Sequence, residues 1–177
     1  MSRVEGQLPE VVVYTDGGCW GNPGPGAWAC VVQHGSQWWQ RASAVACTTN
    51  NRMEIQAAIQ ALNALNQPCA VQLHTDSDYL RQGITTWIHG WRKRGWVTST
   101  REPVKNRDLW QELDERARIH RVEWRWVKGH AGNRWNELCD QLATEAIERL
   151  VRETPKAQIE AARRLFAERQ GASGGEG

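Results

Sequence analysis

Hydrophobic positions in the first third of the chain predict three β-strands. Val11–Thr15 is rich in β-branched residues and stops at Asp16-Gly17-Gly18, which indicates a strand that ends in a turn. Residues 27–34 and 37–47 show the same tendency, while residues 19–26 are rich in glycine and proline and predict a loop. We therefore expect an antiparallel meander of three strands.

The rest of the chain is dominated by helical spacing. Apolar residues recur at helical intervals from Ile55 to Leu65, after the cap-forming residues 48–51. Further helices are expected over residues 77–89, 106–119 and 133–150, and short strands over residues 71–75 and 121–127. A meander followed by alternating helices and strands predicts an α/β fold with one mixed sheet and helices on its faces.

The domain boundaries follow from the same pattern. The core domain is expected over residues 11–150, after an N-terminal extension over residues 1–10. Within the C-terminal segment, residues 151–177, a charged amphipathic helix is expected over residues 154–170. The last stretch, residues 171–177, is rich in glycine and is expected to be disordered.

Composition excludes some classes of protein and leaves others open. The five cysteines are odd in number and lack C-x-x-C spacing, which argues against a disulfide framework and a zinc site. No signal-peptide core and no apolar run long enough to cross a membrane is present, so we expect a cytoplasmic protein with no membrane partner, and we expect a monomer. The net charge of +2 does not indicate a nucleic-acid partner, so any such argument depends on local clusters of charge.

Four acidic residues stand where partly buried carboxylates are unusual. Asp16 and Asp76 each follow a threonine at a predicted strand end, Glu54 lies in the first turn of a predicted helix, and Asp140 lies inside the last helix. If they converge, their repulsion requires a divalent cation or shared protons, and carboxylates without clustered histidine or cysteine suit Mg²⁺ or Mn²⁺. Each residue alone also fits an ordinary structural role, and spacing alone does not show that the four meet.

Two further stretches have a composition that suits nucleic-acid chemistry. His130 lies in a loop between Gly129 and Gly132, where a lone histidine is usually an ordinary surface group. Residues 91–96 place three cations between two tryptophans, with Trp87 one turn upstream. That stretch is either a solvated charged face or a surface on which cations meet phosphates and rings pack on sugars or bases.

Four blocks of the sequence resemble type 1 ribonuclease H, the bacterial ribonuclease HI family. They arrive in family order and cover residues 14–19 with 21–26, residues 48–54, residues 75–77, and residues 126–132 with Asn136, Glu137 and Asp140. The resemblance implies a ribonuclease H-like fold, in which a five-stranded mixed sheet with helices on both faces brings the four carboxylates to one edge. It also implies an endonuclease that cuts the RNA strand of an RNA/DNA hybrid and leaves 5′-phosphate and 3′-hydroxyl ends.

The resemblance assigns roles to the acidic residues and to the loop histidine. It implies two Mg²⁺ ions per active site, with Mn²⁺ as a possible substitute, both bridged by Asp16. Asp140 would help to hold the ion that activates the attacking water, and Glu54 and Asp76 would hold the ion that stabilises the leaving 3′ oxygen. His130 would assist proton transfer or product release.

The resemblance also implies contacts with the hybrid duplex. Asn22 and Asn51 would contact the minor groove, and Thr49 and Asn106 would hold a phosphate of the DNA strand. The basic protrusion of the family, which grips the DNA strand, corresponds here to Trp87, Trp91, Arg92, Lys93, Arg94 and Trp96.

One departure from the family pattern concerns substrate contact. Many members have glutamine two residues after the third carboxylate, where this chain has Asp78. An ionised aspartate accepts hydrogen bonds but donates none, so the usual minor-groove contact is in doubt here. Two alternatives remain: a hybrid-binding module without catalysis, and a DNA-processing nuclease of the same superfold.

Overall fold

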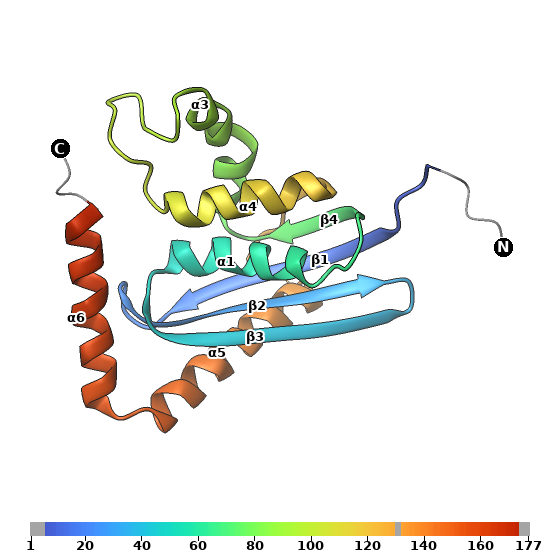
Figure 1. Ribbon diagram of the computed structural model, residues 1–177. Coiled ribbons are helices and arrows are strands. Elements are labelled where there is room, and N and C mark those ends of the chain that lie inside the picture. Colours follow the sequence, from blue (N-terminus) through green and yellow to red (C-terminus); the bar gives the residue numbers. More distant parts are fainter. Residues whose placement is uncertain (1–5, 130–131, 174–177) are drawn as a thin grey trace.

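One mixed sheet forms the centre of the protein (Figure 1). The structure is a computed structural model that describes residues 6–129 and 132–173. Within them, five strands form one sheet in the order β3-β2-β1-β4-β5. The strands are β1 (Glu10–Cys19), β2 (Gly24–His34), β3 (Gln37–Thr48), β4 (Ala70–Thr75) and β5 (Arg121–Trp126). The first three are antiparallel, β4 is parallel to β1 and β5 is parallel to β4, which confirms the predicted mixed sheet.

Helices cover both faces of this sheet, as predicted. The helical segments are α1 (Asn50–Asn63), α2 (Asp78–Gln82), the π-helical turn η1 (Gly83–Trp87), α3 (Ile88–Lys93), α4 (Arg107–Ile119), α5 (Arg134–Glu153) and α6 (Lys156–Ser173). Helix α1 packs on β1 and β2 with α4 beside it, whereas α5 crosses the opposite face against β1, β2 and β3 (Figure 1). Alternation along the strands produces this arrangement, because Cys30 and Val32 of β2 join the α1 core while Val31 joins the α5 core.

The loop between β1 and β2 is shorter than predicted. The expected loop over residues 19–26 is wrong at both ends, because β1 continues to Cys19 and β2 starts at Gly24. Glycine is a poor strand residue, but the space requires it: a Cβ on Gly26 would lie 2.5 Å from Cγ2 of Thr48 and 2.7 Å from the Gly18 carbonyl oxygen. Close packing of backbones therefore overrides propensity here.

The helix expected over residues 77–89 also has different bounds. The helical run extends from Asp78 through η1 to Lys93, so Trp91 and Arg92 belong to helix α3 and not to a separate stretch after it. The hydroxyl of Ser77 accepts a hydrogen bond from the Leu80 amide at 3.1 Å and caps the start. The run ends shortly before Gly95, whose φ of +71° marks the end of helical backbone.

The C-terminal segment forms a helix that packs on the edge of the sheet. Helix α6 contacts β3 (Figure 1), and it includes residues 171–173, so the disorder predicted for residues 171–177 is wrong for these three. Residues 174–177 lie outside the described residues, and the division into core domain and terminal segments stays a prediction.

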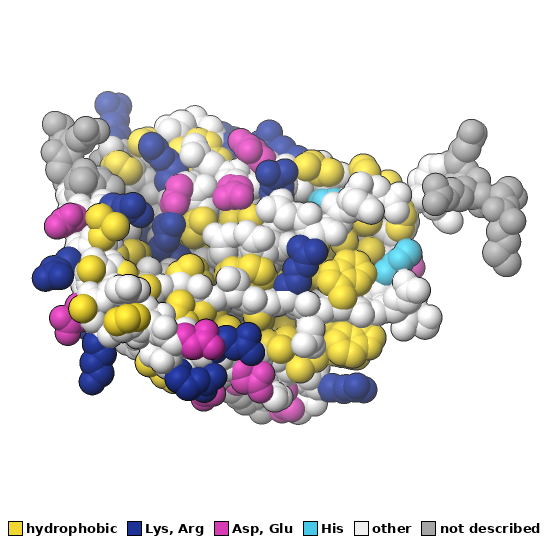
Figure 2. Space-filling model, turned by 60° about the horizontal axis from the view of Figure 1, so that its bottom comes forward, with side chains coloured by type: hydrophobic (Ala, Val, Ile, Leu, Met, Phe, Trp, Pro, Cys, Tyr) yellow, Lys and Arg dark blue, Asp and Glu magenta, His cyan; other side chains and the backbone are white. Residues whose placement is uncertain are grey.

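On the side of the molecule drawn in Figure 2, acidic and basic side chains are interspersed. No helix among the described residues is long and apolar enough to cross a membrane.

Candidate active site

Two parallel strands bring the first pair of carboxylates together. Thr15 of β1 pairs with Thr75 of β4, and β4 ends at this position, so Asp16 and Asp76 follow side by side. The expectation that Asp16 ends its strand is wrong, because β1 continues past it and pairs with β2. Asp16 lies instead at the level where the neighbouring strand stops, which leaves open space beside it.

The third carboxylate comes from the helix packed on the same strands. Thr49 caps α1 by accepting a hydrogen bond from the Arg52 amide at 3.3 Å. Glu54 is the fifth residue of α1 and therefore lies in its second turn, not in the first as predicted. Gly17 makes the close approach possible, because a Cβ there would lie 2.5 Å from the Glu54 backbone nitrogen. Glu54 is 4% exposed.

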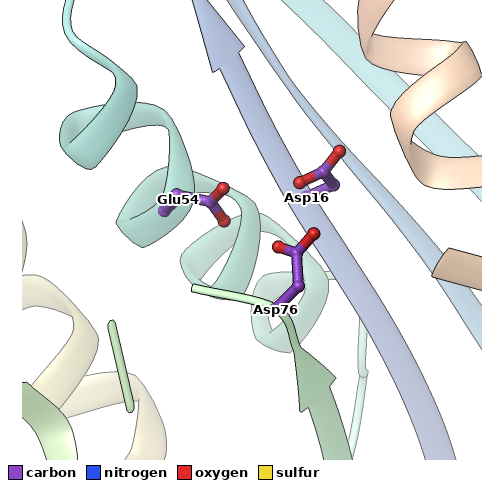
Figure 3. A group of neighbouring side chains, drawn as sticks. All are labelled: Asp16, Glu54 and Asp76. Carbon is purple, nitrogen blue, oxygen red and sulfur yellow. The ribbon is translucent and has the colours of Figure 1, made fainter. Parts of the chain in front are cut away.

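These three side chains point into one small space (Figure 3). Asp16, Glu54 and Asp76 each offer an oxygen, and the three oxygens lie within 4.8 Å of one another. Among the described residues, Oε2 of Glu54 is buried without a hydrogen-bond partner. An unpaired buried carboxylate oxygen facing two other carboxylates fits a hard divalent cation such as Mg²⁺, which prefers oxygen ligands.

The electrostatics of the group show how poorly its charge is balanced within the protein. Burial, and then the charges of Asp76 and Asp140, raise the pKa of Asp16 from 3.8 to about 8. Burial and the charge of Asp16 also raise the pKa of Glu54 well above its usual value. Without a cation Asp16 therefore retains a proton at neutral pH, and a bound cation would replace it.

Asp140 borders the same cavity from the opposite face of the sheet. It lies on α5, and Cys139 beside it is fully buried and donates a hydrogen bond from its thiol to the Tyr14 carbonyl at 3.5 Å. This contact fixes α5 against β1, so that Asp140 lines a cavity of about 580 Å³ together with the three other carboxylates. Asp140 is exposed and lies outside the closest group of three oxygens.

The predicted histidine cannot be placed in this geometry. His130 and the residue after it lie outside the described residues. The loop that leads to it does reach the site, because a Cβ on Gly129 would lie 2.9 Å from Oδ2 of Asp76.

The predicted minor-groove and phosphate residues lie around the start of α1. Asn22 is exposed and its Oδ1 accepts a hydrogen bond from the Asn50 amide at 3.1 Å, while Asn51 lines the cavity. Asn106 is tied to α1 by Arg52, whose Nη1 donates to its Oδ1 at 3.3 Å. Sequence reasoning missed Arg52, although it stands three residues after Thr49 in the same motif.

The tryptophans of the basic segment lie in an aromatic cluster. Trp91 has ring contacts with Trp87, Trp96 and the fully buried Trp110, at centroid distances of 6.0, 6.4 and 5.4 Å. These ring contacts therefore stabilise the basic segment within the protein, with or without a bound substrate.

The cations of the segment differ from one another. Arg92 forms an ion pair with the buried Asp114 of α4. Arg94 is exposed and donates from its Nε to the Val97 carbonyl at 3.2 Å. Lys93 is exposed and has no ion-pair partner within residues 6–129 and 132–173.

Two of the other residues that line the cavity are Asp78 and Trp20. Asp78 is exposed there, and its carboxylate accepts hydrogen bonds from Arg81 at 2.7 Å and from Gln82. The pKa of Asp78 lies below its usual value, mainly because of the hydrogen bond from Arg81. Trp20 also lines the cavity, and the sequence carried no signal for it beyond its place between the two stretches of the first motif.

Comparison with known proteins agrees with this geometry. The RNase H family profile matches residues 9–148. A protein named Ribonuclease H from Phenylobacterium zucineum is 58% identical over 78% of this chain and 91% of its own length, and one from Chromohalobacter salexigens is 54% identical over 84% and 91%. The solved structure of LC9-RNase H1, described as a type 1 RNase H with the type 2 active-site motif, has a TM-score of 0.71 and 36% identity over 80% of this chain and 73% of its own.

The match covers all five strands and both helices that supply acidic residues, α1 and α5 up to residue 148. It extends over far more than half of the chain, and the identity to the relatives named above is high. The protein thus belongs to the ribonuclease H family, in the bacterial ribonuclease HI group that its four motifs resemble.

Proposed function

We propose that this protein is a cytoplasmic, monomeric endonuclease that hydrolyses the RNA strand of RNA/DNA hybrids and leaves 5′-phosphate and 3′-hydroxyl ends. The observation that carries the proposal is the set of three carboxylate oxygens within 4.8 Å of one another, in a chain whose relatives are named Ribonuclease H. The unpaired Oε2 of Glu54 supports a divalent cation as the cofactor. We propose two Mg²⁺ ions per site, or Mn²⁺ as their substitute, as the resemblance to the family implies.

Each carboxylate has a role in this proposal. Asp16 groups with Glu54 and Asp76, and the charge of Asp140 also acts on it, so it would hold both ions, one with Asp140 and the other with Glu54 and Asp76. Cations held by these residues would supply an activated water and would stabilise the leaving 3′ oxygen of the scissile phosphate. His130, on the loop that passes Asp76, would carry a proton to or from the reacting groups.

The substrate would lie across the start of α1 and the basic protrusion. Asn22 and Asn51 would contact the minor groove, where the 2′-hydroxyl distinguishes RNA from DNA. Thr49 and Asn106, held close by Arg52, would bind a phosphate of the DNA strand. The cations Arg92, Lys93 and Arg94 and the aromatic residues Trp87, Trp91 and Trp96 would grip the same strand.

A strand-labelling gel tests this proposal. A hybrid with label on either strand is incubated with the protein in Mg²⁺ or in EDTA. We expect cleavage of the RNA strand in Mg²⁺, none in EDTA, and none by the Asp16→Asn variant, which should still fold and bind the hybrid.

The other outcomes distinguish the alternatives. Binding of the hybrid without cleavage of either strand would indicate a non-catalytic module. Cleavage of the DNA strand or of a DNA duplex would indicate a DNA-processing nuclease of the same superfold. Either result would overturn the proposal.

A further inference from the structure

A tryptophan borders the cavity that contains the carboxylates. Trp20 lies in the turn between β1 and β2, and 44% of its surface is exposed. It lines the cavity together with Asp16 and Asp140, and Ala143 and Ile147 of α5 line the same cavity. A large flat apolar surface therefore stands beside the acidic group, within the same cavity.

The backbone that carries this ring is held firmly. The Trp20 amide donates to the Pro25 carbonyl at 2.7 Å, and the Cys19 thiol donates to the carbonyls of Gly24 and Thr48, both at 3.3 Å. A Cβ on Gly24 would lie 1.9 Å from the Trp20 carbonyl oxygen, so the turn closes without room for a side chain there. A ring on such a turn loses little conformational freedom when a ligand packs on it.

Trp20 also differs in its surroundings from Trp38 and Trp87, two other exposed tryptophans. Trp38 packs on the Trp135 ring at 5.3 Å, and Trp87 packs on Tyr79 and Trp91 at 5.7 and 6.0 Å. In the part of the chain that the structure describes, Trp20 has no aromatic partner. Its ring therefore keeps exposed apolar surface, and the residue lines the cavity that contains the carboxylates.

We propose that Trp20 packs against a ribose of the RNA strand next to the scissile phosphate and so positions that strand over the carboxylates. This inference rests on the proposed function. In a duplex the bases are stacked on one another, so a ring outside the helix meets sugars before it meets base faces. The carbon–hydrogen surface of a ribose suits a flat apolar ring, while the carboxylates beside it act on the phosphate.

The test compares variants of Trp20 with a matched tryptophan far from the cavity. Steady-state cleavage of the hybrid in Mg²⁺ should show a KM about 5- to 20-fold higher for Trp20→Ala, with a smaller change in kcat, because stacking on nucleic acid contributes about that much. Trp20→Phe should recover most of the loss, and Trp20→Leu less. Trp38→Ala, which removes a ring of similar exposure from the start of β3, should behave as the unaltered protein.

Binding is measured separately in a background without cleavage. Fluorescence anisotropy compares the hybrid affinity of Asp16→Asn with that of the double variant Asp16→Asn with Trp20→Ala. We expect the double variant to bind the hybrid about 5- to 20-fold more weakly, a loss similar to that for aromatic stacking on single-stranded nucleic acid. Thermal unfolding of Trp20→Ala should have the same midpoint as the unaltered protein.

Three results would overturn the inference while leaving hybrid hydrolysis intact. They are an unchanged KM and affinity for Trp20→Ala, a loss confined to kcat, and full recovery by Trp20→Leu. Failure of the unaltered protein to cleave any hybrid would instead overturn the proposed function, and the anisotropy comparison would still test the contact.

Discussion

The carboxylates around Asp16 and the cations of α3 differ in how far the protein balances their charge. At the carboxylates, burial and mutual repulsion raise the pKa of Asp16 to about 8, and Oε2 of Glu54 has no hydrogen-bond partner among the described residues. In α3, Arg92 is paired with the buried Asp114, which also accepts from Arg118 at 3.1 Å. The carboxylates therefore need a partner from outside the protein, whereas part of the charge of the α3 cations is already balanced by Asp114.

This difference in charge balance distinguishes residues that indicate a function from residues that stabilise the fold. A group of like charges that the fold leaves unbalanced has to be maintained by a function, because repulsion and desolvation both oppose it. A cation that is paired with a buried aspartate is explained by stability alone. The acidic centre is therefore the stronger indication of function, and the basic protrusion needs residue-by-residue tests.

The largest effect is expected from removing the unbalanced charge itself. In EDTA, Asp16 of the folded protein retains a proton that the unfolded chain releases, since its pKa is about 8 instead of 3.8. The free energy of unfolding should therefore fall as pH rises from about 4 to about 8 and level off above, with a contribution of up to about 1.4 kcal/mol per pH unit. Asp16→Asn should lose all cleavage and also lose this contribution, so it should be the more stable protein at pH 8.

Urea denaturation of both proteins between pH 4 and 9 measures this difference. Mg²⁺ should reduce it, because the cation compensates the ionised carboxylates. Parallel pH profiles in EDTA would contradict the assigned repulsion.

The next effect concerns the backbone that holds the carboxylates together. A Cβ on Gly17 would lie 2.5 Å from the backbone of Met53 and Glu54, whereas a Cβ on Gly18 would have its nearest neighbour, Cδ1 of Ile147, at 4.0 Å. Gly17→Ala should therefore separate α1 from β1, destabilise the protein by about 1–3 kcal/mol and reduce kcat by about 100-fold or more. Gly18→Ala is the matched control and should keep most of both.

Calorimetry and hybrid cleavage measure the two quantities. Equal behaviour of the two alanine variants would show that the close approach of β1 and α1 does not set the geometry of the acidic group.

The sequence predicted the fold well because its main signals are local. Alternation in β2 and helical spacing in α1 depend on neighbouring residues, so one mixed sheet with helices on its faces could be inferred. The resemblance to the family implied the five strands and the helices on both faces. The bounds failed where packing across the chain decided them, as at Gly26 against Thr48. The continuation of the helix to Lys93 was hidden because its basic, aromatic composition resembled a surface loop.

The acidic residues could be chosen from the motifs, but their convergence could not be derived from spacing. Asp16 and Asp76 meet because two strands sixty residues apart are parallel neighbours in register, which is a property of the sheet. The ion pair between Arg92 and Asp114 spans 22 residues and could not be predicted from spacing either. The place of Trp20 at the cavity depends on a turn whose closure the sequence does not display.

A smaller effect separates the paired and unpaired cations of α3. Lys93→Ala should leave the free energy of unfolding within about 0.5 kcal/mol and weaken hybrid binding with a lower salt dependence, by about one unit of the slope of log K against log salt. Arg92→Ala should instead destabilise the protein by about 1–3 kcal/mol, because Asp114 loses a partner while buried. Denaturation and a salt titration of hybrid binding measure both, and a larger loss of stability for Lys93→Ala would reverse the comparison.

The smallest effect tests the acidic departure at the rim of the cavity. Asp78 adds a negative charge where the family often has an amide, and it occupies Arg81 and Gln82. Asp78→Gln removes that charge, supplies a donor and frees Arg81, so hybrid affinity should rise by about 2- to 5-fold at low salt and less at high salt, because exposed charges are screened. The measurement is anisotropy in the Asp16→Asn background.

Glu123→Gln is the control for this last change. Glu123 is also exposed and paired with an arginine, Arg125, at 3.0 Å, but it lies on β5 and is not among the residues that line the cavity. It alters the net charge by the same amount, so a rise in affinity common to both variants would be a general electrostatic effect. A rise confined to Asp78→Gln would show that the aspartate weakens substrate contact at the cavity itself, beside a centre whose own negative charge requires cations.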